Sequence, residues 1–369
     1  MRLRTEVAVI GAGPAGLVLA NLLRRRGIAC VVVERSSRAH VESRARAGVL
    51  EHRTAVLLRR HGLADGLAAS GVPSGSCELR CGTTRTAIPY GELSGGRTHV
   101  VYPQQHLVRD LVRALDGDVL FSHPATVLSD GDGPVVVCRG PDGTRLEIDC
   151  AVVAGCDGAH GLTRRALPWR VVEHRYGFDW LTVLAESTSE GVTYSLHENG
   201  FAGRFPRTAG TSRFYLQCAA GASVEDWPDD RIRRELALRL SMEIGAITEK
   251  DVLELRACVV SPMVIGHVAL LGDAAHLVTP AGAKGMNLAI ADAVQLAEHI
   301  GSGAPLAAYS EARIGPVWNA VEFSDWMMGL ISTPPTSFDR GLQLARMRRL
   351  AESTAFATAF SGMYVGVDE

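Results

Sequence analysis

The 369-residue sequence has no uninterrupted apolar run that approaches the roughly 18 residues of a membrane-spanning helix. It also has little net charge, because 38 lysine and arginine residues nearly balance 40 aspartate and glutamate residues. Such a chain offers no general attraction to nucleic acid or to an anionic membrane, so neither is expected as a partner. The start Met1-Arg2-Leu3-Arg4 leads directly into a strand-like segment, which leaves no room for a signal peptide and predicts a cytoplasmic location.

Clustered metal ligands are also lacking. The eight cysteines are scattered along the chain, and Cys77 and Cys81 are the only close pair. Without a second pair or a nearby histidine, this pair does not match a zinc site. Reduced thiols in apolar, strand-like runs pack as small hydrophobic side chains, so we expect no metal.

The sequence does contain a nucleotide-binding pattern near its start. The apolar run at positions 7–10 suits a buried parallel strand, and Gly11, Gly13 and Gly16 follow it in G-x-G-x-x-G spacing before a helical segment. Gly11 permits the tight turn, Gly13 lets the backbone approach a pyrophosphate, and Gly16 lets the helix pack on the strand. The pyrophosphate would then meet the positive end of a helix.

Glu34 completes this pattern, because it follows a second apolar strand at positions 30–33 and lies eighteen residues after Gly16. A carboxylate at this place can accept hydrogen bonds from both hydroxyl groups of an adenosine ribose, and it would repel a ribose 2′-phosphate. The site therefore favours FAD or NAD over NADP. The motif by itself does not decide between FAD and NAD.

Three later segments are also candidates for ligand contact. The arginine-rich segment 36–48 is either a solvated helix face or an anion-contacting segment. Asp157 follows a buried strand in a Gly-Cys-Asp-Gly sequence, which suits a plain turn or a close approach to a cofactor. Asp273 ends another buried strand before a helix that starts near Gly285, where doubly wound folds bind ligands.

The pattern of strands and helices predicts several regions. Residues 1–175 read as a nucleotide-binding domain with a strand excursion at about 72–98, an amphipathic helix at 49–62 and a strand region at 135–154. Alternating strands at 176–266 predict a separate α+β domain with an antiparallel sheet. Residues 267–300 return to the first domain, and residues 301–369 are mostly helical.

Four ordered motifs resemble those of the single-component FAD-dependent aromatic hydroxylases (group A flavoprotein monooxygenases), above all the 4-hydroxybenzoate 3-monooxygenases. They are GAGPAG at 11–16, RARAGVLE at 44–51, AGCDGAHG at 154–161 and GDAAHLVTPAGAKGMN at 272–287. The resemblance spans almost the whole chain. It implies an α/β FAD-binding domain of the Rossmann-like, glutathione-reductase type, an inserted antiparallel-sheet α+β substrate domain, and a C-terminal helical interface region, compatible with a homodimer.

The same resemblance implies FAD as the cofactor and NADPH or NADH as the co-substrate. It places FAD contacts at Gly11, Gly13, Ala15, Gly16, Glu34, Arg35, Arg44, Arg46, Gln104, Asp157, Asp273, Gly285, Met286 and Asn287. It places NAD(P)H contacts at Arg35, Arg38, Arg44, His160 and Arg256. No second G-x-G-x-x-G is present, in agreement with a family whose co-substrate uses a surface groove.

The reaction implied is hydroxylation of a 4-hydroxybenzoate-like aromatic acid ortho to its hydroxyl group, with O2 and a flavin C4a-hydroperoxide. A hydroxylase of an aminobenzoate or of a more substituted phenol, and a non-catalytic flavin- or nucleotide-binding protein, are the alternatives. The resemblance assigns substrate binding to Arg207, Tyr215, Phe205 and Tyr194, and catalysis to Tyr194, Tyr364 and Pro280. It also places Arg213 near the flavin.

Two positions depart from the family pattern. Phe205 stands where the family has a serine that helps to bind the substrate carboxylate, and Ser74 stands where the family's proton relay ends in a histidine. Losing a hydroxyl donor to a carboxylate weakens binding by roughly 1.5–3 kcal/mol. From the residues alone, Tyr194 and Tyr215 would be strand aromatics that pack across a sheet, and only the aligned motifs favour a role in the site.

Overall fold

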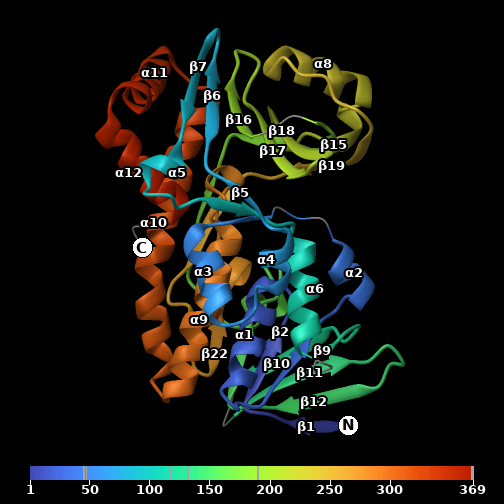
Figure 1. The fold of residues 1–369 in the computed structure, drawn as a ribbon. Helices are drawn as coiled ribbons and strands as arrows, with labels where there is room; N and C mark the ends of the chain where they lie inside the picture. Colours follow the sequence, from blue (N-terminus) through green and yellow to red (C-terminus); the bar gives the residue numbers. More distant parts are fainter. Residues whose placement is uncertain (45, 47, 116–118, 131–132, 189–190, 367–369) are drawn as a thin grey trace.

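The computed structural model describes the whole chain except residues 45, 47, 116–118, 131–132, 189–190 and 367–369. Figure 1 shows two sheet-containing halves, one above the other, with the C-terminal helices along one side. In the described residues, the lower half is organised on a six-stranded sheet and the upper half on a seven-stranded sheet. This is the α/β fold with an antiparallel-sheet region and C-terminal helices that the sequence predicted.

The six-stranded sheet carries the nucleotide-binding pattern. Its order is β21-β22-β13-β2-β3-β9, and its strands pair in parallel except for the edge strand β21. Its strands are β2 (Val7–Ile10), β3 (Cys30–Val33), β9 (Val119–Leu120), β13 (Val152–Gly155), β21 (Val264–Ile265) and β22 (Val268–Leu270). Parallel strands joined by a crossover helix place their carboxyl ends, and the loops that follow, at one edge of the sheet.

Both faces of this sheet are covered, which explains its continuous apolar strands. Val7, Val9 and Val32 belong to a core with helices α1 (Pro14–Arg25), α6 (Gln104–Leu115) and α9 (Gly285–Ser302). Ala8 and Ile10 face a second core under a four-stranded sheet. That sheet has the order β1-β12-β11-β10 and consists of β1 (Arg2–Arg4), β10 (Ala125–Asp130), β11 (Pro134–Arg139) and β12 (Arg145–Asp149).

The seven-stranded sheet forms the upper half, in the order β19-β15-β18-β17-β16-β6-β7. It contains β15 (Phe178–Glu186), β16 (Val192–Leu196), β17 (Ala202–Thr208), β18 (Thr211–Ala219) and β19 (Ile247–Leu253). Two strands from much earlier in the chain, β6 (Cys77–Cys81) and β7 (Thr84–Ile88), extend it because β6 pairs in parallel with β16. Helix α8 (Asp229–Leu240) packs on this sheet through Ile232 and Leu236.

The remaining elements lie outside these three sheets. The first are α2 (Arg38–Ser43), β4 (Val49–Leu50), α3 (His52–Arg60), α4 (Asp65–Ser70), β5 (Val72–Ser74), α5 (Tyr90–Leu93) and β8 (His99–Val101). Further elements are α7 (Leu162–Ala166), β14 (Val171–Arg175), η1 (Val224–Asp226), β20 (Arg256–Val260), η2 (Gly272–Ala274), β23 (His276–Leu277) and η3 (Pro280–Gly282). The last helices are α10 (Leu306–Ile331), α11 (Ser337–Glu352) and α12 (Thr354–Val365).

The C-terminal helices α10 and α12 pack against the seven-stranded sheet. Phe323 and Met327 of α10 and Tyr364 of α12 share one buried apolar cluster with Trp180 and Tyr194 of the sheet. This packing fixes α12 beside residues that precede it by more than 150 positions. In the part of the chain that the structure describes, no helix is both long enough and apolar enough to cross a bilayer.

Candidate active site

A cavity of about 690 Å³ lies at the carboxyl ends of the parallel strands β2, β3 and β13 and reaches the seven-stranded sheet. The lower sheet contributes residues that follow its strands, among them Gly11, Glu34 and Asp273. The upper sheet contributes Phe205, Pro206, Arg207, Arg213 and Tyr215. The cavity therefore brings most of the predicted cofactor residues, though not Gly16 or Asn287, and part of the predicted substrate residues to one place.

The glycine turn leaves room for a ligand at the start of α1. Gly11 has a φ of 108°, which disfavours a side chain, and a Cβ there would overlap the carbonyl oxygen of Cys156. A Cβ on Gly16 would overlap the carbonyl oxygen of Gly11. The Cβ position of Gly13, in contrast, has no atom within 4 Å and borders the cavity. The backbone can thus receive a pyrophosphate at Gly13, beside a helix end with no acidic residue in its first turn.

Glu34 lies beside this turn and is held in place by two backbone groups. Its Oε2 accepts a hydrogen bond of 2.9 Å from the N–H of Ala12, and its Oε1 accepts one of 2.8 Å from the N–H of Ser36. Each carboxylate oxygen can accept a further hydrogen bond. The fixed carboxylate therefore suits the two ribose hydroxyl groups of an adenine nucleotide.

Three arginines line the cavity next to Glu34. Arg35, Arg44 and Arg46 form no ion pair with a carboxylate within the described part of the chain. Partial burial, together with the charges of Arg46 and Arg35, lowers the pKa of Arg44. This group of like charges is electrostatically unfavourable until an anion neutralises it, and a diphosphate supplies that charge.

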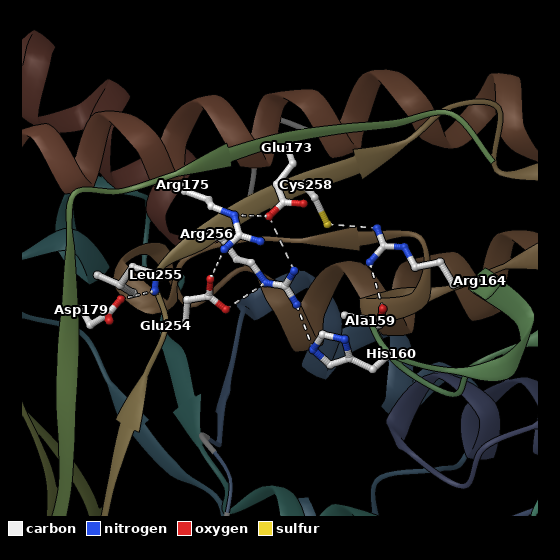
Figure 2. A network of polar contacts seen from close by, with 10 residues as sticks. All are labelled: Ala159, His160, Arg164, Glu173, Arg175, Asp179, Glu254, Leu255, Arg256 and Cys258. Carbon is white, nitrogen blue, oxygen red and sulfur yellow. Dashed lines mark hydrogen bonds and ion pairs between the residues drawn. The ribbon is translucent and has the colours of Figure 1, made fainter. Parts of the chain in front are cut away.

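The five positions predicted for NAD(P)H do not all reach the cavity. Arg35, Arg44 and His160 line it, whereas Arg38 and Arg256 are not among its lining residues. Arg38 is paired with Glu42 at 2.7 Å. Arg256 donates a hydrogen bond of 3.0 Å to Nε2 of His160 (Figure 2).

Arg256 also lies close to two carboxylates. Its guanidinium is 3.6 Å from the carboxylate of Glu173 and 3.8 Å from that of Glu254 (Figure 2). Arg175 contacts the same two carboxylates, at 2.9 Å and 2.6 Å. The charge of Arg256 is therefore largely neutralised by these carboxylates. Of Arg256 and His160, only His160 borders the cavity.

Several predicted cofactor residues use their side chains within the protein. The carboxylate of Asp157 accepts hydrogen bonds from the backbone N–H, at 3.0 Å, and the hydroxyl group of Thr163. Asn287 accepts a hydrogen bond of 3.0 Å from the N–H of Glu51 and donates to two backbone carbonyls. Both side chains therefore stabilise the loops around the cavity.

Other predicted cofactor residues border the cavity directly. Asp273 is exposed in η2, shortly after β22, and the cavity wall also contains Ala15, Gln104, Gly285 and Met286. The amino-terminal end of α9, at Gly285, also has no acidic residue in its first turn. A negative charge that develops on a ligand here would interact favourably with the helix dipole.

The predicted substrate side contains a buried arginine with an unused donor. Arg207 donates from Nη2 to Oε1 of Gln105 at 3.1 Å, while its Nη1 is buried and has no hydrogen-bond partner in the described structure. Burial and the nearby charge of Arg213 lower the pKa of Arg207 to about 10. A buried cationic donor of this kind is costly without a partner, so the site suits an anionic ligand group.

Tyr194 and Tyr364 form a buried pair. Their hydroxyl oxygens are 2.7 Å apart, and burial raises the pKa of both hydroxyl groups. The hydroxyl group of Tyr194 also donates to the carbonyl of Ala281 at 3.3 Å. The carbonyl of Pro280, which was also predicted to take part in catalysis, accepts from the N–H of Ala283. Two neutral hydroxyl groups in contact can pass a proton along their hydrogen bond.

Phe205 separates this pair from the cavity. Its ring packs edge-on against Tyr194, at 5.3 Å between ring centroids, and edge-on against Tyr215, at 5.2 Å. Phe205 and Tyr215 line the cavity, whereas Tyr194 and Tyr364 are not among its lining residues. Tyr194 is thus one side chain removed from the cavity wall.

Sequence reasoning missed several residues of this region. His99 donates from Nε2 to the backbone carbonyl of Tyr364 at 2.8 Å, and Tyr90 donates to Ser74, whose Oγ is 2.9 Å away. Gln105, the partner of Arg207, immediately follows the predicted Gln104. These contacts join segments far apart in the sequence, and no local pattern marks them.

Among the described residues, no group of three or more histidine, cysteine or acidic side chains could hold a metal.

Comparisons with known proteins show which proteins this chain is similar to. A family described as "FAD binding domain" matches residues 4–324. The p-hydroxybenzoate hydroxylase of Acinetobacter baylyi is 35% identical over 388 residues, which cover 99% of this chain and 96% of that protein. The 3-amino-4-hydroxybenzoate 2-monooxygenase of Streptomyces cremeus is 28% identical, over 79% of this chain and 77% of that protein.

A solved structure supports the fold. The p-nitrophenol 4-monooxygenase of Pseudomonas putida superposes with a TM-score of 0.87 over 100% of both chains, at 18% identity. The glycine turn, the fixed carboxylate of Glu34 and the arginine group fit the ADP half of FAD. Since the family match covers most of the chain and the first relative is aligned almost from end to end, this chain belongs to the FAD-dependent aromatic hydroxylases, which bind FAD and use NAD(P)H as co-substrate.

Proposed function

We propose that this protein hydroxylates a 4-hydroxybenzoate-like aromatic acid ortho to its hydroxyl group, with NAD(P)H and O2. The observation that carries this proposal is the buried Nη1 of Arg207, which has no hydrogen-bond partner among the described residues. It lies in a cavity whose wall at this end contains the rings of Phe205 and Tyr215. An anionic group on an aromatic ring satisfies both features, because the carboxylate pairs with the guanidinium while the ring packs against aromatic side chains.

In this proposal, residues of the lower sheet hold FAD. Gly11, Gly13 and Gly16 shape the pyrophosphate site, Glu34 binds the ribose, and Asp273 bonds the ribityl chain. Residues 1–175 and 267–300 would form this cofactor domain, and residues 176–266 the substrate domain. FAD, when bound and reduced by NAD(P)H, supplies the activation of O2 and the transfer of one oxygen atom.

The chain's own residues then prepare the aromatic ring. Arg207 and Tyr215 would hold the carboxylate, and Tyr194 would hydrogen-bond the phenol oxygen. A phenol has a pKa near 10, so it becomes a strong carbon nucleophile only when a hydrogen bond favours its phenolate. Tyr364 would carry the proton away from Tyr194, to which it is already bonded. Phe205 has to move aside for this contact, or the ring has to bind next to it.

The test is a panel of substituted benzoates and phenols that includes 4-hydroxybenzoate and aminobenzoates. We expect one or more acids to accelerate NAD(P)H consumption and to gain one oxygen atom, as measured by product mass. The panel should also include phenols whose acid group is displaced on the ring, because the ring of Phe205 occupies the space beside Tyr215. If no aromatic acid stimulates NAD(P)H consumption in flavin-loaded protein, the proposed substrate class is wrong.

A further inference from the structure

One buried carboxylate contacts both ends of the turn that carries Asp273. Asp292 on α9 accepts, at Oδ2, a hydrogen bond of 2.9 Å from the N–H of Gly272. The same oxygen lies 2.6 Å from Nε2 of His276, which follows the turn. Asp292 and His276 are 0% and 1% exposed, so neither side chain touches solvent. Asp292 therefore fixes the turn just before and just after Asp273.

The other oxygen of this carboxylate joins a third element. Oδ1 of Asp292 accepts a hydrogen bond of 2.7 Å from Nε of Arg313 on α10. Burial by itself raises the pKa of Asp292, but His276, Arg313 and the N–H of Gly272 outweigh burial and lower it to about 2. The charge is thus matched inside the protein, as a buried carboxylate requires. The contacts connect α9, α10 and the turn into one rigid unit.

The backbone of this turn is enclosed by neighbouring elements, and its only exposed residue in η2 is Asp273. Gly272 has a φ of 57°, and a Cβ there would lie 3.0 Å from the Cβ of Ala289 and 3.5 Å from the Cβ of Ala15. Its backbone is therefore enclosed between α9 and the start of α1. Asp273 is the exposed residue of η2, and it borders the cavity. A fixed backbone with one exposed carboxylate can hold a hydroxylated ligand in a single position.

We propose that Asp292 is a positioning residue for the cofactor. It does not line the cavity, but it holds the turn from Gly272 to His276 so that Asp273 stays directed at the ribityl side of FAD. This inference rests on the proposed contact between Asp273 and the ribityl chain. It assigns no role to Asp292 in the ADP half of the site, where Glu34 and the glycine turn are held by their own contacts.

The experiment compares two ligands on the full-length chain freed of FAD. In Asp292→Asn, the side chain keeps its size but loses the charge that binds Arg313 and His276. We expect the Kd of FAD to rise at least about tenfold, which corresponds to about 1.4 kcal/mol. We expect the Kd of ADP, which lacks the ribityl chain, to change by no more than about twofold. An equal rise for FAD and ADP would show a general structural role and overturn the inference.

Asp179→Asn is the matched control. Asp179 is also buried and also accepts from two backbone groups, the N–H of Gly221 at 2.7 Å and that of Leu255 at 3.1 Å, but it lies in the seven-stranded sheet. We expect it to leave the Kd of FAD unchanged within about twofold. If it weakens FAD as much as Asp292→Asn does, the effect is not specific to the turn and the inference fails.

The double variant separates this inference from the role of Asp273. If Asp292 acts through Asp273, adding Asp292→Asn to Asp273→Ala should weaken FAD binding little further, whereas additive losses would overturn the inference. If Asp273→Ala alone leaves the Kd of FAD unchanged, the ribityl contact of Asp273 is the assignment that fails. If Asp292→Asn does not fold, His276→Gln replaces it, because glutamine retains an N–H donor. This variant should raise the Kd of FAD more than the Kd of ADP, by a smaller factor than Asp292→Asn. If the ratio of the two Kd values is unchanged, the inference is contradicted.

Discussion

The hydroxyl oxygens of Tyr194 and Tyr364 lie 2.7 Å apart, although 170 residues separate the two tyrosines in the sequence. Tyr194 is on β16 and Tyr364 is near the end of α12, so the contact joins the seven-stranded sheet to the C-terminal helices. Both rings are almost completely buried. In the proposed reaction, this pair would carry away the proton that leaves the phenol of the substrate.

Removing the Tyr194 hydroxyl should uncouple the reaction. Tyr194→Phe keeps the ring contacts with Phe201 and Phe205 but removes the bond to Tyr364. Because the substrate phenolate loses its hydrogen bond, we expect the hydroxylated product per NAD(P)H consumed to fall by roughly 10-fold to 100-fold, with peroxide in its place. Tyr309→Phe, which removes a buried hydroxyl bonded to the carbonyl of Leu270, is the control and should stay coupled. Full coupling in Tyr194→Phe would contradict a phenolate role.

Arg207→Gln should raise the KM of the aromatic acid while FAD stays bound. The side chain loses the charge that pairs with the carboxylate, a contact worth about 1.5–3 kcal/mol, so KM should rise about 10-fold to 100-fold. Steady-state NAD(P)H oxidation measures the change. An analogue with an amide in place of the carboxylate is the control, since its KM should respond much less. An unchanged KM for the acid would remove the assignment of Arg207.

Phe205→Ser should strengthen the binding of 4-hydroxybenzoate. The substitution removes the ring between Tyr194 and Tyr215 and adds a hydroxyl donor on the cavity wall to which Arg207 also belongs. We expect the Kd of 4-hydroxybenzoate, measured by the change in flavin absorbance, to fall about tenfold. Phe205→Leu removes the ring without adding a donor and separates the two effects. A weaker binding in Phe205→Ser would indicate that the cavity is shaped for a different acid.

His99 should make the protein less stable in mild acid. Burial lowers the pKa of His99 to about 4, whereas an unfolded histidine takes up a proton near pH 6.5. The unfolded state therefore binds more protons between these values, and the free energy of unfolding falls as the pH falls through that window. From pH 7 to pH 5 this single group should cost about 2 kcal/mol.

Denaturant unfolding of the wild type and of His99→Gln at both pH values tests this expectation. Glutamine can still donate to the carbonyl of Tyr364 but does not titrate, so the variant should lose less stability in acid. Equal losses in the two proteins would show that His99 is not the group responsible.

The sequence predicted the elements whose burial is set by local pattern. The strands at 7–10 and 30–33 have the predicted bounds, because both sheet faces are covered and a glycine turn or a polar residue ends each strand. The helix predicted over 49–62 was partly wrong. Val49 and Leu50 form β4, since they pair with β8, and the helix begins at His52. The region 135–154 is three strands, β11 to β13, because the chain reverses between the first two.

The site was predicted where a motif fixes the backbone. Gly11, Glu34 and Asp273 follow strands of one parallel sheet, so they had to meet at one edge. Contacts across distant segments could not be read in this way, as with Arg207 and Gln105, or Asp292 and the turn at Gly272. Arg256 was predicted to contact NAD(P)H, but it contacts Glu173 because β14 lies beside β20, a pairing of distant segments that the sequence does not reveal.

The position of α12 also sets when the site can be assembled during synthesis. Tyr364 and the carbonyl of Met363, which accepts from Lys284, come from this helix, whereas Gly11 and Glu34 are made first. A nascent chain can fold its first sheet on the ribosome, but the hydroxyl of Tyr194 has no tyrosine partner until translation passes residue 364. A message that stops before codon 354 would therefore yield a chain able to form the nucleotide turn, but in which Tyr194 lacks its tyrosine partner and Lys284 lacks the carbonyl of Met363.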